Sequence, residues 1–223
     1  MKERGDIPLL LNKDYSSPSV FLPENLLREA RRQKSISDCP VPEICVLDPD
    51  GDLADYLLQK GEAIKNKCWA CYHSNLYSFK IEGIEIGIIP CIVGASYAVL
   101  VAEQLFVSGC KYLISITSAG IIGNPSSNKR FALITEAIRD EGTSYHYLPP
   151  DFPSILPQTF YKKLAVVSAV GNCPYFEAKS WTTDAPYRET QTAISAMEKI
   201  NVYCVEMEAS ALYAFAAAKK NNV

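Results

Sequence analysis

Short apolar runs alternate with longer amphipathic segments along most of the chain after Pro42. We expect strands at residues 43–48, 85–93, 111–117, 131–136 and 164–168, with one or two more within 69–82, and helices at 53–67, 95–108, 188–199 and 207–220. Short β-branched runs that alternate with helices of this length indicate a largely parallel sheet covered on both faces. The pattern therefore predicts an α/β domain over residues 43–223, a three-layer α/β/α sandwich around a central mixed, mostly parallel sheet.

The first 42 residues do not follow this pattern. Five prolines interrupt them, and the basic amphipathic stretch Glu24–Lys34 lies between these breaks. We predict an N-terminal arm and one helix over residues 1–42, with the helix charges facing solvent. No linker rich in Gly, Ser or Pro marks a second domain, so we expect a single domain overall.

Composition narrows the range of partners. The 223 residues include 22 basic and 25 acidic side chains, which gives no electrostatic reason to expect binding to nucleic acid or an anionic membrane. The chain shows neither a signal peptide nor a run of about 18 apolar residues that could cross a bilayer. Most of the eight cysteines lie in apolar runs, as Cys45 and Cys91 do, where thiols behave as small hydrophobic groups. We therefore expect a cytoplasmic protein with reduced thiols and no disulfide framework.

Two predicted strand ends carry groups suited to an anion, and ligands of such sheets bind at the carboxyl ends of strands. Gly94 separates an apolar strand from a helix whose N-terminus favours negative charge. Thr117 and Ser118 follow another strand and offer donors to phosphate oxygens or to an attacking water. Ordinary turn chemistry explains each segment equally well when it is taken alone.

A third strand end, in residues 179–190, combines aromatic and cationic side chains. Trp181, Tyr187 and Arg188 could stack on a nucleobase and hydrogen-bond to it beside Asp184. The alternative is that Thr183 or Asp184 caps the following helix while Trp181 belongs to the core.

The fourth strand end places Glu206 and Glu208 inside an otherwise apolar stretch, residues 203–218. A buried carboxylate needs hydrogen-bond donors or a cation, or it becomes neutral. The vicinal hydroxyls of a ribose supply two such donors and would satisfy Glu208. The alternative, a favourable interaction of both glutamates with a helix dipole, suits exposed carboxylates better than these.

Residues 205–216, VEMEASALYAFA, resemble the glutamate–methionine–glutamate signature of the purine/uridine nucleoside phosphorylase superfamily. The segments CIVGAS and SITSAG resemble its glycine loop and phosphate loop, and RDEGTSYHYLPP and WTTDAPYRET resemble a bacterial, uridine phosphorylase-like branch. The resemblance runs from about Pro42 to the C-terminus. It implies the nucleoside phosphorylase fold and a pentosyltransferase that uses phosphate to cleave a nucleoside, with pyrimidine favoured over purine, and gives the free base and ribose 1-phosphate.

The resemblance also implies roles for particular residues. Glu208 would bind the ribose 2′- and 3′-hydroxyls, and Met207 would pack under the sugar. It assigns catalytic roles to Glu208 and Arg188, phosphate contacts to Gly51, Gly94, Thr117 and Ser118, and base contacts to Thr183, Tyr187, Arg188 and Val205. Phosphate is then a co-substrate, no metal or organic cofactor is required, and a homodimer or hexamer is expected.

Several departures from the family pattern keep other functions open. Ser115 and Leu53 stand at positions that are often arginine, and Pro186 stands where many members have a stacking phenylalanine. The chain ends at Val223, where members continue into another strand and helix, so the C-terminal end is a candidate truncation. A hydrolase of the same fold and a nucleoside-binding paralogue without catalysis are therefore alternatives.

A metal or redox protein is a weaker alternative. Cys68 and Cys71 form a CxxC motif close to His73. A structural zinc site needs a second pair of ligands at defined spacing, and the sequence shows none.

Overall fold

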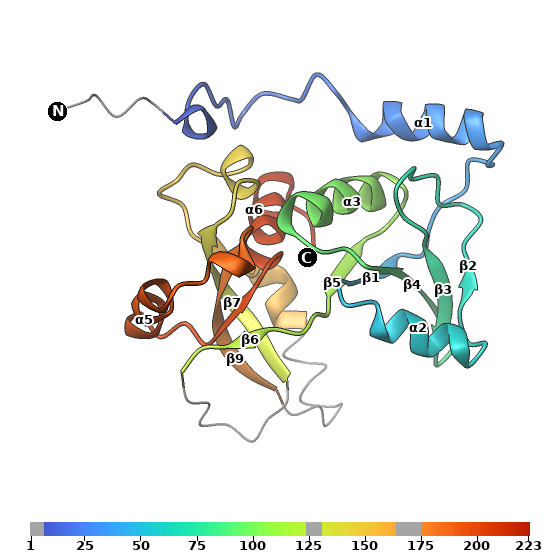
Figure 1. Cartoon of the computed structure of the whole chain (residues 1–223). Helices are drawn as coiled ribbons and strands as arrows, with labels where there is room; N and C mark the ends of the chain where they lie inside the picture. Colours follow the sequence, from blue (N-terminus) through green and yellow to red (C-terminus); the bar gives the residue numbers. More distant parts are fainter. Residues whose placement is uncertain (1–6, 124–130, 164–174) are drawn as a thin grey trace.

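The computed structural model describes residues 7–123, 131–163 and 175–223, whose strands form two five-stranded sheets (Figure 1). The first sheet has the order β2-β3-β4-β1-β5 and the second the order β6-β10-β9-β7-β8. The strands are β1 (Ile44–Asp48), β2 (Ile64–Lys65), β3 (Tyr77–Ile81), β4 (Ile84–Pro90), β5 (Tyr112–Ser115), β6 (Gly120–Ile121), β7 (Phe131–Asp140), β8 (Ser154–Ile155), β9 (Tyr175–Thr183) and β10 (Cys204–Glu206). The helices are α1 (Pro23–Lys34), α2 (Asp52–Gln59), α3 (Ala95–Val107), α5 (Gln191–Lys199) and α6 (Ala209–Lys219), with short 3-10 turns at Pro8–Leu10, Ser144–His146 and Pro186–Arg188.

The first sheet is buried on both faces around its interior strand β1, which pairs in parallel with β4 and β5. Alternate side chains of β1 point to opposite faces, as the pleat of a strand requires. Cys45 and Leu47 join the core formed with α3, whereas Val46 joins a smaller cluster with Leu57 of α2. The apolar run at 43–48 is therefore a two-sided buried strand, and the antiparallel strands β3 and β2 extend the sheet on one side.

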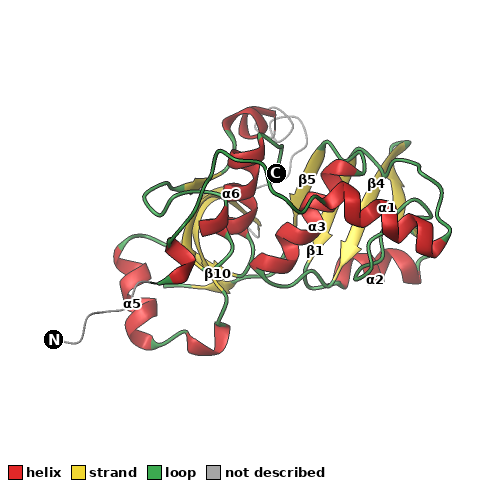
Figure 2. Ribbon diagram, turned by 90° about the horizontal axis from the view of Figure 1, so that it is seen from above, coloured by secondary structure: helices red, strands yellow, loops and turns green. Residues whose placement is uncertain are grey.

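The second sheet has β9 at its centre, parallel to both β7 and β10. Trp181 of β9 packs in a cluster with Val205 and with residues of α5. On the other face Tyr213 of α6 packs against Ala137 of β7. Helix α6 also contributes Phe215 to the core of the first sheet, so it lies between the two sheets and joins them (Figure 2).

The α/β class, the mixed strand directions and the helices on both faces are as the sequence predicts, but the strands form two sheets where one central sheet is expected. The helices predicted over 53–67 and 188–199 are also shorter than expected. The helix predicted over 53–67 ends at Gln59 and β2 follows, because Gly61 adopts a φ of 71° that reverses the chain. The helix predicted over 188–199 begins at Gln191, because the Thr190 side chain caps it by accepting a hydrogen bond from the Ala193 N–H. The strand predicted at 164–168 lies outside the described residues.

The cysteines depart from the expected uniform set of reduced, buried thiols. Cys39 and Cys68 form a disulfide that connects the segment after α1 to the loop after β2. These residues are 29 positions apart, so only the folded chain brings them together. Cys91 is exposed rather than buried, because it lies beyond the end of β4.

The N-terminal arm runs across the top of the molecule to α1 in Figure 1. Lys13 Nζ lies 3.0 Å from His146 Nδ1, and the Tyr15 hydroxyl donates to the Tyr145 carbonyl, so the arm contacts the loop after β7. No helix in the described part of the chain is long and apolar enough to cross a membrane.

Replacing Leu47 with alanine is expected to lower the free energy of unfolding by about 2–5 kcal/mol, because the side chain is fully buried and its loss leaves a cavity. Ile81→Ala, at the exposed end of β3, should change it by less than about 1 kcal/mol. Denaturant unfolding of both variants tests this, and equal losses would contradict the assignment of β1 to the core.

Candidate active site

Five segments from the two sheets meet around a cavity of about 270 Å³. Four of them follow the carboxyl ends of β1, β4, β5 and β9, and the fifth runs from β10 into α6. The lining residues are Pro49, Asp50, Val93, Thr117, Ser118, Ala119, Gly120, Pro186, Glu189, Val205, Glu206, Met207 and Glu208. This is the edge at which sheets of this class bind ligands.

The loop after β1 is held by the buried carboxylate of Asp48. One oxygen accepts from the Gly51 N–H at 3.1 Å and the other from the Ala54 N–H at 2.8 Å, which caps the first turn of α2. Gly51 adopts a φ of 86°, a conformation that favours glycine. Gly51 does not line the cavity; it shapes the turn that places Pro49 and Asp50 there.

Glu206 is a buried carboxylate whose two oxygens accept four hydrogen bonds. Oε1 accepts from Ser180 Oγ at 2.9 Å and from Thr182 Oγ1 at 2.5 Å. Oε2 accepts from the N–H groups of Glu208 and Ala209, each at 2.7 Å. The side chain therefore caps the N-terminus of α6 and joins β9 to β10, so the helix-terminus explanation holds for this glutamate.

The network continues beyond Glu206. Thr182 Oγ1 also accepts from the Ser210 N–H at 2.9 Å, and the Ser210 hydroxyl donates to Glu141 at 2.8 Å. The N–H of Ser144 donates to the same carboxylate. Hydrogen bonds thus fasten the loop after β7 to the first turn of α6.

The Glu208 carboxylate also lines the cavity, and it accepts fewer hydrogen bonds from described residues than Glu206 does. The Glu208 side chain is 3% exposed, and its Oε1 accepts from the Gly94 N–H at 2.7 Å. Burial raises its pKa to about 7, and the charges of Glu206 and Asp50 act in the same direction against the hydrogen bonds from the Gly94 and Met207 backbone. Among the ion pairs of the described residues, none involves Glu208. It is therefore sheltered from solvent and has no cationic partner among the described residues, which is the environment that the nucleoside hypothesis predicts.

Gly94 precedes α3 with a φ of 95°, which favours glycine over residues with a side chain. The sequence predicts that its N–H contacts phosphate. In the structure this N–H instead holds Glu208 in place.

Ser118 and Thr117 line the cavity as predicted, but both donors of Ser118 already have an acceptor. The Ser118 N–H donates to Asp50 Oδ2 at 2.5 Å, and its hydroxyl donates to Asp50 Oδ1 at 3.0 Å. The Thr117 hydroxyl donates to the Ser118 carbonyl at 3.1 Å. Sequence reasoning missed Asp50, because nothing in its loop shows that Ser118, 68 positions later, lies beside it.

The residues predicted to contact a base divide into two groups. Val205 and Met207, the latter predicted under the sugar, line the cavity. Thr183 is buried and accepts from the Ala185 N–H at 3.2 Å, away from the lining. Tyr187 is 99% exposed and Arg188 is also exposed, and neither lines the cavity. Their contacts with a base stay predictions.

The cavity is acidic. The described residues of its lining include four carboxylates, Asp50, Glu189, Glu206 and Glu208, and no lysine, arginine or histidine. Ser115 and Leu53, which occupy positions that are often arginine, do not line it either, and Leu53 packs on the cluster under α2. Across residues 7–123, 131–163 and 175–223, no group of three or more His, Cys, Asp or Glu side chains is placed to hold a metal ion.

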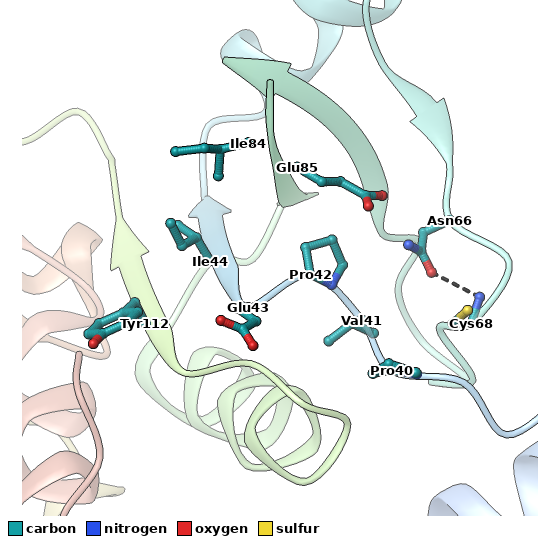
Figure 3. A pocket seen from close by; sticks show the side chains of 10 residues that line it. All are labelled: Pro40, Val41, Pro42, Glu43, Ile44, Asn66, Cys68, Ile84, Glu85 and Tyr112. Atoms are coloured by element: carbon teal, nitrogen blue, oxygen red, sulfur yellow. Dashed lines mark hydrogen bonds between the residues drawn. The ribbon is translucent and has the colours of Figure 1, made fainter. Parts of the chain in front are cut away.

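A larger cavity, of about 490 Å³, lies at the opposite end of the first sheet, where Ile44 begins β1 and Tyr112 begins β5 (Figure 3). Two of its polar side chains, Asn66 and Glu43, already have partners. Asn66 donates to Ser78 Oγ and accepts from the Cys68 N–H, and Glu43 forms an ion pair with Lys111. The smaller cavity at the carboxyl ends of the strands is therefore the better candidate for a substrate site.

Replacing Glu206 with glutamine is expected to lower the free energy of unfolding by about 1–3 kcal/mol, because an amide cannot accept at both of its terminal atoms. Glu62→Gln, at an exposed position, should change it by less than about 0.5 kcal/mol. Denaturant unfolding compares the two variants. Equal stability would show that the Glu206 network does not support the fold.

Comparison with known proteins finds sequence relatives of this chain. The chain is 27% identical over 132 residues to the purine nucleoside phosphorylase of Plasmodium vivax (strain Salvador I), which covers 57% of this chain and 54% of that protein. It is 26% identical over 188 residues to the DeoD-type purine nucleoside phosphorylase of Streptococcus pyogenes serotype M12 (strain MGAS2096), covering 75% of this chain and 76% of that protein.

Solved structures of uridine phosphorylase from Vibrio fischeri ES114 share the fold. One has a TM-score of 0.70 at 18% identity and covers 84% of this chain and 82% of its own. Another, in complex with 6-hydroxy-1-naphthoic acid, has a TM-score of 0.69 at 17% identity, over 86% of this chain and 76% of its own. The sequence profile of one family matches residues 43–222, and the chain therefore belongs to the phosphorylase superfamily.

Proposed function

We propose that this protein cleaves the N-glycosidic bond of a ribonucleoside, with Glu208 binding the ribose. The observation that carries the proposal is a carboxylate that is 3% exposed, faces a cavity and forms no ion pair with a described residue. Vicinal hydroxyls provide the donors that such a group needs. The family supports the same conclusion, since the relatives it matches are nucleoside phosphorylases by name.

The cavity suits the charge that develops during this reaction. As the bond to the base breaks, the sugar becomes cationic at C1′, and nearby carboxylates stabilise that charge in a site shielded from water. Glu208 is held by Gly94 and the start of α6, so it needs little reorganisation as the charge forms. Met207 and Val205 supply apolar surface for the sugar or base.

Phosphate is the acceptor that the family suggests. The products are then the free base and ribose 1-phosphate, and the structural likeness to uridine phosphorylase supports a pyrimidine nucleoside. A second acceptor, water, is favoured by the hydrogen bonds between Asp50 and Ser118 and by the absence of cationic side chains among the described lining residues. A panel of purine and pyrimidine nucleosides, incubated with and without phosphate and assayed for free base, tests the proposal. A cytoplasmic homodimer or hexamer stays a prediction from the resemblance.

Replacing Glu208 with glutamine is expected to lower kcat/KM for base release by about a hundredfold or more. The substitution removes one acceptor and the negative charge that would contact the sugar, and each hydrogen bond to a charged group contributes about 1.5–3 kcal/mol. Glu62→Gln, which makes the same chemical change at an exposed site, should keep the activity. Equal base release by Glu208→Gln and the unmodified protein would remove Glu208 from the site.

Nucleoside affinity should rise as the pH rises through about 7 and then level off, because that is the pKa of Glu208. Only the ionised carboxylate accepts hydrogen bonds at both oxygens, so the fraction competent to bind the ribose falls about tenfold per pH unit below the pKa. Calorimetric titration with a nucleoside analogue whose glycosidic bond cannot be cleaved, in phosphate-free buffer, measures this without turnover and without interference from the titration of phosphate. The Glu208→Gln variant should show no such inflection, and a pH-independent affinity of the unmodified protein would contradict the assignment.

A further inference from the structure

Asp50 occupies the position at which an anion would bind Ser118. Its two carboxylate oxygens accept separately from the Ser118 N–H, at 2.5 Å, and from the Ser118 hydroxyl, at 3.0 Å. A phosphate would use the same donors in the same way, with two oxygens on two adjacent groups. The Asp50 carboxylate therefore occupies the position beside Ser118 that the family resemblance assigns to phosphate.

The loop that carries Asp50 is held firmly. The carboxylate of Asp48 fixes the turn through the N–H groups of Gly51 and Ala54, and the Cys91 N–H donates to the Asp48 carbonyl at 2.8 Å. Phosphate would therefore have to displace a side chain whose backbone is anchored on both sides. Such a displacement costs the hydrogen bonds that Asp50 already forms.

The charges around the cavity also oppose the binding of phosphate. Phosphate carries one or two negative charges at neutral pH, and it would enter a lining whose described residues include four carboxylates and no cationic side chain. A water molecule is neutral and meets no such repulsion. The negative charge of Asp50 also raises the pKa of Glu208, so both carboxylates contribute to the negative potential in the cavity.

We infer that Asp50 determines the acceptor: it fills the anion-binding position at Ser118, excludes phosphate and leaves water to attack the sugar. The choice of water rests on the proposed nucleoside cleavage, whereas the exclusion of phosphate does not. In the hydrolysis, the water oxygen forms a bond to C1′ as the bond from C1′ to the base nitrogen breaks. The electron pair of that bond goes to the base. One water proton passes to the Asp50 carboxylate and from there through solvent to the base, so the products are free base and ribose.

Titration with inorganic phosphate tests the exclusion directly. Asp50→Ala and Asp50→Asn should bind phosphate at least about tenfold more tightly than the unmodified protein, because a competing charged acceptor is removed. Asp50 is exposed, so neither change is expected to prevent folding. Asp52→Asn removes an exposed carboxylate that does not line the cavity, and it should bind phosphate as weakly as the unmodified protein. Equal phosphate affinity in all four proteins would overturn the inference.

Product analysis tests the choice of acceptor. The unmodified protein should release base and free ribose at a rate that phosphate does not raise, and Asp50→Ala should lose about tenfold or more of this activity. With phosphate present, any activity that Asp50→Ala retains should yield ribose 1-phosphate. Formation of ribose 1-phosphate by the unmodified protein would overturn the inference and keep the proposed nucleoside cleavage. If neither the unmodified protein nor any variant releases base from any nucleoside, the proposed function fails. The phosphate titration still decides whether Asp50 keeps phosphate from the donors of Ser118.

Discussion

The rest of the site depends on the four hydrogen bonds that the Glu206 carboxylate accepts. The carboxylate accepts hydrogen bonds from β9 on one oxygen and from the first N–H groups of α6 on the other. Those contacts fix the point at which β10 becomes α6, and hence the direction of the Glu208 side chain. Because the network has no free acceptor to offer a ligand, it acts as a support that holds Glu208 beside the cavity.

Two glutamates separated by a single residue therefore have different physical roles. Glu206 exchanges water for four protein donors, so its burial is compensated. Glu208 has the Gly94 N–H as its closest described donor, and burial raises its pKa to about 7. A carboxylate in this state gains most from a ligand that brings donors or positive charge. A ribose with a cationic anomeric carbon provides both.

The same acidity that suits a cationic sugar disfavours an anionic acceptor. Asp50 adds to the negative potential and also occupies the donors of Ser118. Under the proposed function and the inference about Asp50, this chain would share the fold of its superfamily and bind the sugar through Glu208, while Asp50 would decide which group receives the sugar, since function depends on the site and not on the fold.

The sequence by itself determined the α/β class, the strands β1, β3, β4, β5 and β7, most helices, and the sheltered character of the stretch that carries Glu208. Those features follow from periodicity and from apolar neighbours, which are local properties of the chain. It could not separate Glu206 from Glu208, because the donors that satisfy Glu206 include Ser180 and Thr182, 26 and 24 positions away. Only the tertiary structure paired Cys39 with Cys68, left Tyr187 in solvent and placed Asp50 on Ser118. Each of these outcomes depends on where distant segments meet, and burial, charge and hydrogen bonding at such meeting points are not encoded in any short stretch of sequence.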